Sequence, residues 1–231
     1  MRILGIDASG PALAVALIDD TTIIAEFMWT RPRTAGSQLV SWVDRIVVEC
    51  GRPDALAVGV GPGSFTGVRI AVTTAKALAY AWQIPVKGVS SLQAWSLGAP
   101  YGHPVLVSSE RRGKAFYVGY YQNHASGSET LIPQMAIDGN RLPDLFPVDD
   151  EVLVLGPLGD SKEGLRLVGP RAVAYNIALL GSSVALLARA ALMADQGDSV
   201  MALSPLYVRT PAITMAGQVY EIEGDEIHGG Q

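Results

Sequence analysis

The sequence predicts an α/β fold, because strand-like and helical patterns alternate along its first half. Three short apolar segments separated by polar turns come first, which is typical of an antiparallel meander. A helix–strand–helix–strand series follows, and a glycine-rich turn joins its strand to its second helix. A hydrophobic fraction of 49% with 17% charged residues indicates a folded chain rather than a disordered one.

The three leading strands are expected at residues 2–8, 12–18 and 22–29. Each is rich in apolar and β-branched residues, as half-buried or buried strands are. Ser9-Gly10-Pro11 and Asp19-Asp20 supply the turns between them.

An amphipathic helix is expected over residues 37–50. Leu39, Val43 and Ile46 recur at steps of four and three, so they share one face. Cys50 closes this segment, and its setting favours a buried thiol over a nucleophile. A single cysteine excludes an internal disulfide and a cysteine-rich metal site, and it fits a reducing cytoplasm.

A phosphate-type loop is expected between a strand at 55–60 and a helix at 70–82. Its glycines permit positive φ or close approach of another chain, and backbone N–H groups at a helix start attract anions. The run is neither a Walker A loop nor the dinucleotide fingerprint, since it lacks Gly-Lys-Ser/Thr and the required glycine spacing. The residues that would contribute are Gly61, Gly63, Ser64, Thr66, Gly67 and Arg69.

A short strand at 85–88 and a short helix at 90–97 complete the first domain, which is expected to span residues 1–103. A smaller α/β domain is expected over 104–205, and a return segment with an acidic, flexible tail over 206–231. The elements expected in the second domain are strands at 105–107, 115–121, 130–137 and 151–155, a polar turn at 122–128 and a helix at 173–195.

The charge distribution argues against a self-sufficient RNA-binding protein. The formal net charge is −5, and four acidic residues without a basic one lie in residues 217–231, so the rest of the chain is close to neutral. Asp7 interrupts the first apolar run, and the apolar stretch 177–194 contains Gly181 and Arg189. We therefore expect neither a signal peptide nor a membrane span, and a cytoplasmic location.

The run Gly-Pro-Gly-Ser-Phe-Thr-Gly-Val-Arg at 61–69 closely resembles the signature of the bacterial TsaB (YeaZ) family. The resemblance extends through 70–79 and 84–92 and includes the opening 3–9 and the late Pro-Leu-Tyr-Val-Arg at 205–209. It covers the N-terminal half well and the middle loosely. It implies a two-lobed fold of the actin/Hsp70/sugar-kinase type, ribonuclease H-like, with a reduced second lobe.

The resemblance also implies a function. Proteins of this family are non-catalytic subunits that pair with the transferase TsaD in forming threonylcarbamoyladenosine at position 37 of tRNA. The implied partners are a TsaD-like transferase, a TsaE-like ATPase in a ternary complex, a second copy of the chain when it is alone, and tRNA only through the complex. No cofactor, metal or catalytic residue is expected in this chain.

Asp7 and Ser9 close the first strand and carry two interpretations. In active members of the superfamily, a carboxylate and a hydroxyl there help to hold metal and phosphate, so both residues would be remnants of a nucleotide site. Alternatively, Asp7 makes an Asx turn into the hairpin. Arg69 likewise could bind a phosphate, a partner carboxylate or a neighbouring surface acid.

Histidines are missing where the resemblance places the metal site of the active relative TsaD. There, two histidines four residues apart share one helix face, and Ser91 and Trp95 stand at the matching positions here. Neither side chain replaces imidazole as a metal ligand. No two of His103, His124 and His228 form a helical pair.

Two enzymatic alternatives remain open from the sequence. An ATP-dependent phosphotransferase of the same superfamily would need an adenosine loop, for which 164–169 and Gly181-Ser182 are short candidates. A metallopeptidase-like protein is the weaker alternative, because no metal cluster or Gly-x-Ser-x-Gly elbow is present. A separate difference from the family lies at residues 109–110, where Ser109-Glu110 stands in place of the usual Asp-Ala.

The leading hypothesis makes a surface the product of the fold. The helices at 37–50 and 70–82 are expected to form a face used for homodimerisation and, in exchange, for the transferase. The residues assigned to this interface are Leu39, Val43, Ile46, Val72, Lys76 and Ala79.

Overall fold

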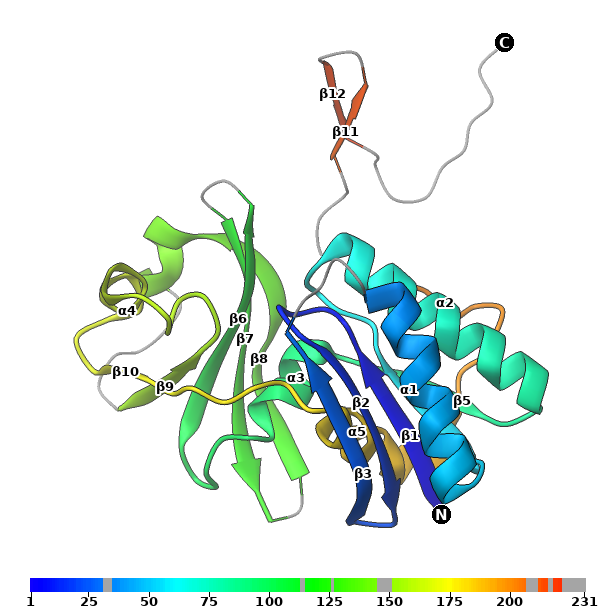
Figure 1. The fold of residues 1–231 in the computed structure, drawn as a ribbon. Coiled ribbons are helices and arrows are strands. Elements are labelled where there is room, and N and C mark those ends of the chain that lie inside the picture. Colours follow the sequence, from blue (N-terminus) through cyan, green and yellow to red (C-terminus); the bar gives the residue numbers. More distant parts are fainter. Residues whose placement is uncertain are drawn as a thin grey trace.

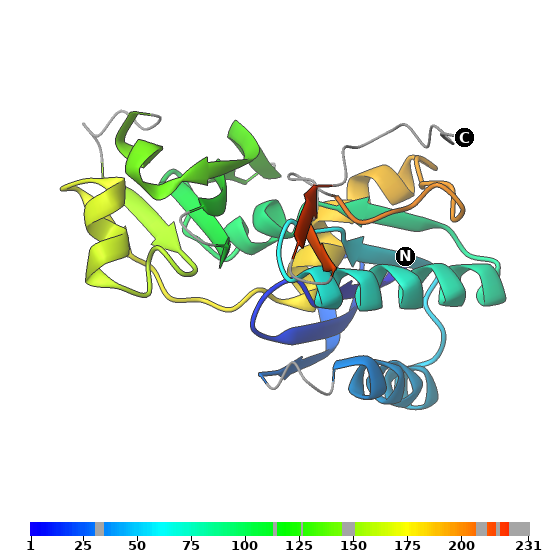
Figure 2. The same cartoon turned by 90° about the horizontal axis from the view of Figure 1, so that it is seen from above.

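Two five-stranded mixed sheets form two lobes, which lie side by side in Figure 1 and are seen from above in Figure 2. The expected α/β class and two-lobed plan are confirmed. The protein is represented by a computed structural model, which describes residues 1–30, 35–112, 115–125, 127–144, 151–206, 212–215 and 218–221.

The first sheet has the strand order β3-β2-β1-β4-β5. Its central strand β1 pairs antiparallel with β2 and parallel with β4, so the meander and the helical crossovers meet there. The elements of this half are β1 (Arg2–Asp7), β2 (Leu13–Asp19), β3 (Thr22–Trp29), α1 (Ala35–Cys50), β4 (Ala55–Gly59), α2 (Phe65–Trp82), β5 (Val86–Val89) and α3 (Ser91–Ser96).

The second sheet has the order β10-β9-β6-β7-β8. A short hairpin of β11 (Ala212–Met215) and β12 (Gln218–Glu221) follows the last helix. The elements of the second half are β6 (Pro104–Arg112), β7 (Ala115–His124), β8 (Gly127–Asp138), the 3₁₀ helix η2 (Gly139–Asp144), β9 (Val152–Leu155), α4 (Lys162–Val168), β10 (Ala172–Ala174) and α5 (Gly181–Met193).

The two lobes repeat one topology. In each, the first strand pairs antiparallel with the second and parallel with the fourth, and the fourth pairs parallel with the fifth. In each, a helix follows the fourth strand and another follows the fifth. The duplication is therefore structural, although the sequence has no repeat at a fixed period.

The last helix of each half packs on the other half. α3 follows β5 but packs against β6 and β7, whereas α5 follows β10 but packs against β1 and β2. The apolar cluster between the lobes accordingly contains Ile3 and Ala57 of the first sheet, Val105 and Tyr121 of the second, and Trp95 of α3. Burial of this shared cluster stabilises both lobes together, since apolar area removed from water is the main driving term.

The outer faces of the sheets have separate cores. α1 and α2 lie side by side over the first sheet and bury Leu39, Val43 and Ala71 against it. α4 and η2 cover the second sheet around Phe116 and Val154. Among the described helices, none has the length and apolarity that crossing a membrane requires.

The helix expected at 173–195 is wrong over its first part. Ala172–Ala174 instead pairs with β9 as strand β10, and the helix begins only at Gly181. The apolar run cannot distinguish a short edge strand from a helical turn, and the pairing partner decides. The sequence also missed α4, and β7 and β8 extend through most of the expected polar turn at 122–128.

The domain boundaries at 103/104 and 205/206 stay a prediction, and we retain them as a working proposal. The backbone from Asp198 to Leu206 lies along the first sheet, where Asp198 N donates to Val86 O at 2.7 Å and Leu206 N donates to Val60 O at 2.8 Å. The remainder of the expected return segment, 207–209, and the acidic end, 222–231, lie outside the described residues.

Gly5 permits the close approach of α5 to the first sheet. A Cβ added there would lie 2.1 Å from the carbonyl oxygen of Gly181 and 2.9 Å from the nitrogen of Ala185, both backbone atoms. We expect Gly5→Ala to lower the free energy of unfolding by about 1–3 kcal/mol, because the exchanged helix must move outward. Urea denaturation of the intact chain measures this.

Gly10→Ala is the matched control. A Cβ at Gly10 meets nothing within 4 Å, so its effect should stay within about 0.5 kcal/mol. Equal effects of the two substitutions would contradict the importance of the α5 contact.

Candidate functional site

The candidate site is centred on Asp7, the last residue of β1, whose side chain is completely buried. Its Oδ1 accepts hydrogen bonds from Ser9 N at 2.6 Å and Ser9 Oγ at 2.7 Å. Its Oδ2 accepts one from Ser91 Oγ at 2.5 Å. The bond from Ser9 N is the Asx-type contact expected of a turn, so one of the two interpretations of Asp7 is realised in the local geometry.

Ser91 connects this carboxylate to the glycine loop. Its Oγ accepts from Gly61 N at 3.0 Å, and its backbone N donates to Gly61 O at 3.0 Å. Only glycine fits at position 59, because a Cβ there would lie 1.7 Å from Asp7 Oδ2. The first residue of α3 therefore holds the loop and the end of β1 together.

The other side of the loop is fixed to the β1–β2 turn. Ser64 N donates to Ser9 O at 2.7 Å, and Ser64 Oγ caps α2 by accepting from Gly67 N at 3.3 Å. Cβ atoms at Gly63 and Gly67 would lie 2.3 Å from Ser9 O and 1.8 Å from Ala8 O. These glycines serve close backbone packing, and Gly61 also has a positive φ of 94°.

Burial raises the pKa of the Asp7 carboxyl, against the opposing effect of the hydrogen bonds from Ser91 and Ser9. Both of its oxygens have internal donors, so neither is directed at solvent. The arrangement suits a structural carboxyl that organises a turn. A role of Asp7 and Ser9 in holding a nucleotide phosphate stays a proposal.

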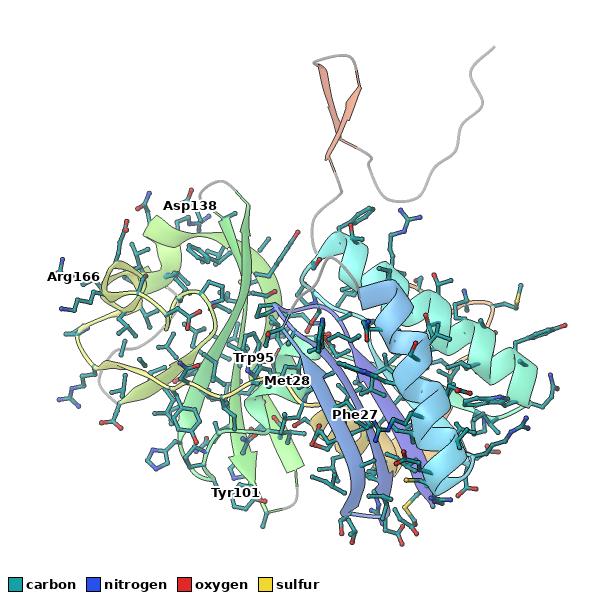
Figure 3. All side chains as sticks on the ribbon, in the orientation of Figure 1. Phe27, Met28, Trp95, Tyr101, Asp138 and Arg166 are labelled. Atoms are coloured by element: carbon teal, nitrogen blue, oxygen red, sulfur yellow. The ribbon has the colours of Figure 1, made fainter. Side chains whose placement is uncertain are left out.

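α3 carries the two positions where the resemblance places histidines in the active relative. Ser91 and Trp95 are buried, and Trp95 Nε1 donates to Ile177 O at 2.7 Å. Figure 3 shows Trp95 at the junction of the lobes. Trp95 thus stabilises the lobe interface, whereas Ser91 joins β1 to the glycine loop within the first lobe.

Further polar contacts join α3 to the second sheet. Ser90 Oγ donates to Gln134 Oε1, and Asn123 Nδ2 donates to Ser96 O at 2.6 Å and Ala99 O at 3.0 Å. Burial raises the pKa of Tyr121 to about 12, although a hydrogen bond with Ser90 opposes the shift. Tyr121 therefore stays protonated at neutral pH and suits a packing role better than an acid–base role.

Other expected sites are also engaged internally. Ser182 N and Oγ donate to the Glu26 carboxylate at 3.0 and 2.9 Å, so the start of α5 already holds an anion of this chain. Gly164 lies within α4, where a Cβ would be 2.2 Å from Leu158 O. Within the described ranges, no group of three His, Cys, Asp or Glu side chains could hold a metal ion.

Arg69 and Thr66 project from the first turn of α2 and are exposed. The Arg69 guanidinium carbon lies 5.1 Å from the centroid of the Phe65 ring. This cation–π contact limits the motion of the Arg69 side chain.

Most residues assigned to the interface face inward. Leu39, Val43, Ile46, Val72 and Ala79 are buried in the core of the first lobe. Lys76 Nζ donates to the carbonyls of Met201 at 3.1 Å and Leu203 at 2.8 Å.

The outward side chains of the same helices were not among the residues expected at the interface. Val40 and Val48 of α1 and Tyr80 of α2 are 59%, 76% and 69% exposed. These residues could have been found in the sequence as apolar positions on the side of each helix opposite the buried face.

The family described as "TsaD: tRNA N6-adenosine threonylcarbamoyltransferase" matches residues 35–211. "tRNA threonylcarbamoyladenosine biosynthesis protein TsaB" of Bacillus subtilis is 33% identical over 68% of this chain and 71% of its own length. The Escherichia coli protein of the same name is 37% identical over 55% of this chain and 58% of its own length. The solved structure "YeaZ from Pseudomonas aeruginosa" superposes with a TM-score of 0.75 and 26% identity, covering 89% of this chain and 99% of that one.

The buried carboxyl predicts a pH-dependent stability. The raised pKa means that the folded state binds this proton more tightly than the unfolded state, whose Asp pKa is near 3.8. The stabilisation is complete below about pH 4 and is lost as pH rises through the folded-state pKa. The unfolding free energy of the wild type minus that of Asp7→Asn should therefore fall with rising pH, as measured by urea denaturation between about pH 4 and 7.

Asp160→Asn provides the control, because Asp160 is exposed in the turn before α4. Its difference from the wild type should change little over the same range. If the unfolding free energy of the wild type minus that of Asp7→Asn rises with pH, or does not change, the assignment of a raised pKa to the buried Asp7 carboxyl is rejected.

Proposed function

The chain belongs to the TsaB (YeaZ) family, and on that premise we propose that it is a non-catalytic subunit of the complex that makes threonylcarbamoyladenosine in tRNA. Membership supports a role in this modification. We further propose that the chain binds and activates a TsaD-like transferase, joins a TsaE-like ATPase in a ternary complex, and reaches tRNA through that complex.

The non-catalytic role rests on the hydrogen bonds that Asp7 and the side chains of α3 make within the protein. The Asp7 carboxyl at the end of β1 accepts hydrogen bonds from Ser9 and Ser91. Trp95 stands where the resemblance places the second metal-binding histidine, and its Nε1 donates to Ile177 O at the interface between the lobes. Side chains with all of their polar atoms bonded inside the protein favour a supporting role over a reacting one.

The outer face of α1 and α2 is the proposed contact for the transferase, and in its absence for a second copy. Val40, Val48 and Tyr80 expose apolar area, and Thr73 and Ala77 of α2 are small and exposed. Exposed apolar side chains on adjacent helices are typical of protein interfaces. Since the inward residues hold the helices on their own sheet, we assign the interface to these outward ones.

A phosphotransferase is the second candidate, and the duplicated two-lobed plan favours it. It would require the start of α5 or the end of β1 to accept a nucleotide, and both already bind groups of this chain. Calorimetry of the isolated protein with ATP and Mg²⁺ distinguishes the candidates, since tight binding with turnover would support the enzyme.

The isolated chain should leave tRNA unmodified. Incubated with tRNA and threonylcarbamoyl-adenylate, it should form no threonylcarbamoyladenosine by mass spectrometry of digested tRNA. Addition of the transferase and ATPase subunits from the same cell should produce the modification. Modification by the chain alone would overturn the proposal.

If the outer face of α1 and α2 binds the transferase, a charge introduced on that face should weaken binding, and a charge introduced elsewhere should not. Ala77→Glu, on the outer face of α2, should weaken co-purification with the transferase at least about tenfold, because it buries an unpaired carboxylate in the interface. Ala190→Glu is the matched control, being an exposed alanine in α5 on the opposite side of the sheet. Equal binding by both variants would reject this placement.

A further inference from the structure

We propose that Arg69, on the first turn of α2, is a pre-positioned contact for a carboxylate side chain of the transferase subunit, and that Ser91 and Asp7 are the positioning residues that hold this turn. The inference rests on the proposed function, because it takes the outer face of α2 as the surface that meets the transferase.

Arg69 has the features of an unfilled anion contact. Within the described parts of the chain, no carboxylate lies within ion-pair distance of its guanidinium. Arg45 of α1, which is also exposed, already pairs with Glu49 at 2.9 Å. The Arg69 guanidinium carbon lies 5.1 Å from the centroid of the Phe65 ring, and the N–H groups of a guanidinium can donate to both oxygens of one carboxylate.

The surroundings of Arg69 favour a single carboxylate over a nucleic-acid backbone. α2 has one other basic residue, Lys76, and its ammonium is already bound to two backbone carbonyls. A phosphate backbone is normally bound by several cations together, and this chain carries a formal net charge of −5. One guanidinium beside a largely uncharged helix face suits one acidic side chain.

Arg69 also continues the proposed interface. Arg69, Thr73, Ala77 and Tyr80 follow one another at steps of four, four and three, and all are exposed. These positions lie on one side of α2. A charged contact at the end of an apolar helix face would fix the register of the partner and raise its association rate.

The positioning role follows from a continuous set of hydrogen bonds. Ser91 Oγ joins Asp7 Oδ2 to Gly61 N at one side of the loop. Ser9 joins Asp7 Oδ1 to Ser64 N at the other side. Ser64 caps α2, and the next residue is Phe65, which makes the cation–π contact with Arg69. Both ends of the loop thus depend on one buried carboxyl.

Arg69→Ala and Arg69→Lys test the contact. Titration of the full-length chain with the purified transferase should show a loss of affinity of at least about tenfold for Arg69→Ala, and partial retention for Arg69→Lys, which keeps the charge but not the paired donors. Arg52→Ala is the matched control, since its guanidinium carbon lies 5.8 Å from the Trp82 ring at the opposite end of α2. It should change affinity less than about twofold.

Ser91→Ala tests the positioning. It should accelerate amide hydrogen exchange at residues 61–69 and also weaken transferase binding. Ser108→Ala is its control, because the buried Ser108 Oγ ties the second-lobe loop by accepting from Leu158 N at 3.0 Å and donating to Leu155 O at 2.7 Å. It should lower stability without changing either readout. Ser9→Ala, which removes a single bond to Asp7, serves if Ser91→Ala does not fold.

The outcomes separate the claims. Unchanged affinity of Arg69→Ala for the transferase would reject the contact. The contact would also be rejected if Arg69→Ala lost binding of inorganic phosphate or tRNA while it bound the transferase normally. Unchanged exchange at 61–69 in Ser91→Ala and Ser9→Ala would reject the positioning role. Failure of the wild type to bind the transferase would overturn the proposed function, while the exchange experiment still tests the positioning.

Discussion

The structure depends on an exchange of helices between its two halves. α3 follows the first sheet and packs on the second, and α5 follows the second sheet and packs on the first. Gly5 and Gly181 allow the α5 backbone to contact the first sheet directly. Because each sheet buries one face against a helix from the other half, neither lobe has a complete core alone, and the free energy of burial couples them.

The same exchange determines the chemistry around Asp7. By packing between the lobes, α3 brings Ser91 to the end of β1, where its hydroxyl meets the carboxyl and the glycine loop at once. Burial disfavours the charged carboxylate, and the donors of Ser9 and Ser91 compensate in part. A polar cluster that satisfies itself in this way stabilises a turn and, through Ser64, the start of α2.

The duplication of the fold shows how little sequence a shared topology requires. In each lobe the first strand includes a buried polar residue, Asp7 or Ser108, that packs against a glycine at the end of the parallel neighbour, Gly59 or Gly156. The two polar groups differ, and so do their hydrogen-bond partners. Strand pairing needs only apolar pattern and compatible turns, so the repeated arrangement leaves no repeat in the residues.

The sequence alone determined the local elements: the three leading strands, the Leu39–Val43–Ile46 helix and the strand–loop–helix around residues 61–69, because periodicity and turn chemistry act over a few residues. The sequence alone also identified the family, because the loop motif at residues 61–69 is long. Only the tertiary structure decided that β10 is a strand, that Ser91 reaches Asp7, and that Lys76 binds backbone carbonyls. Those outcomes depend on partners distant in the chain, and a local pattern specifies that a residue is buried but not what it is buried against.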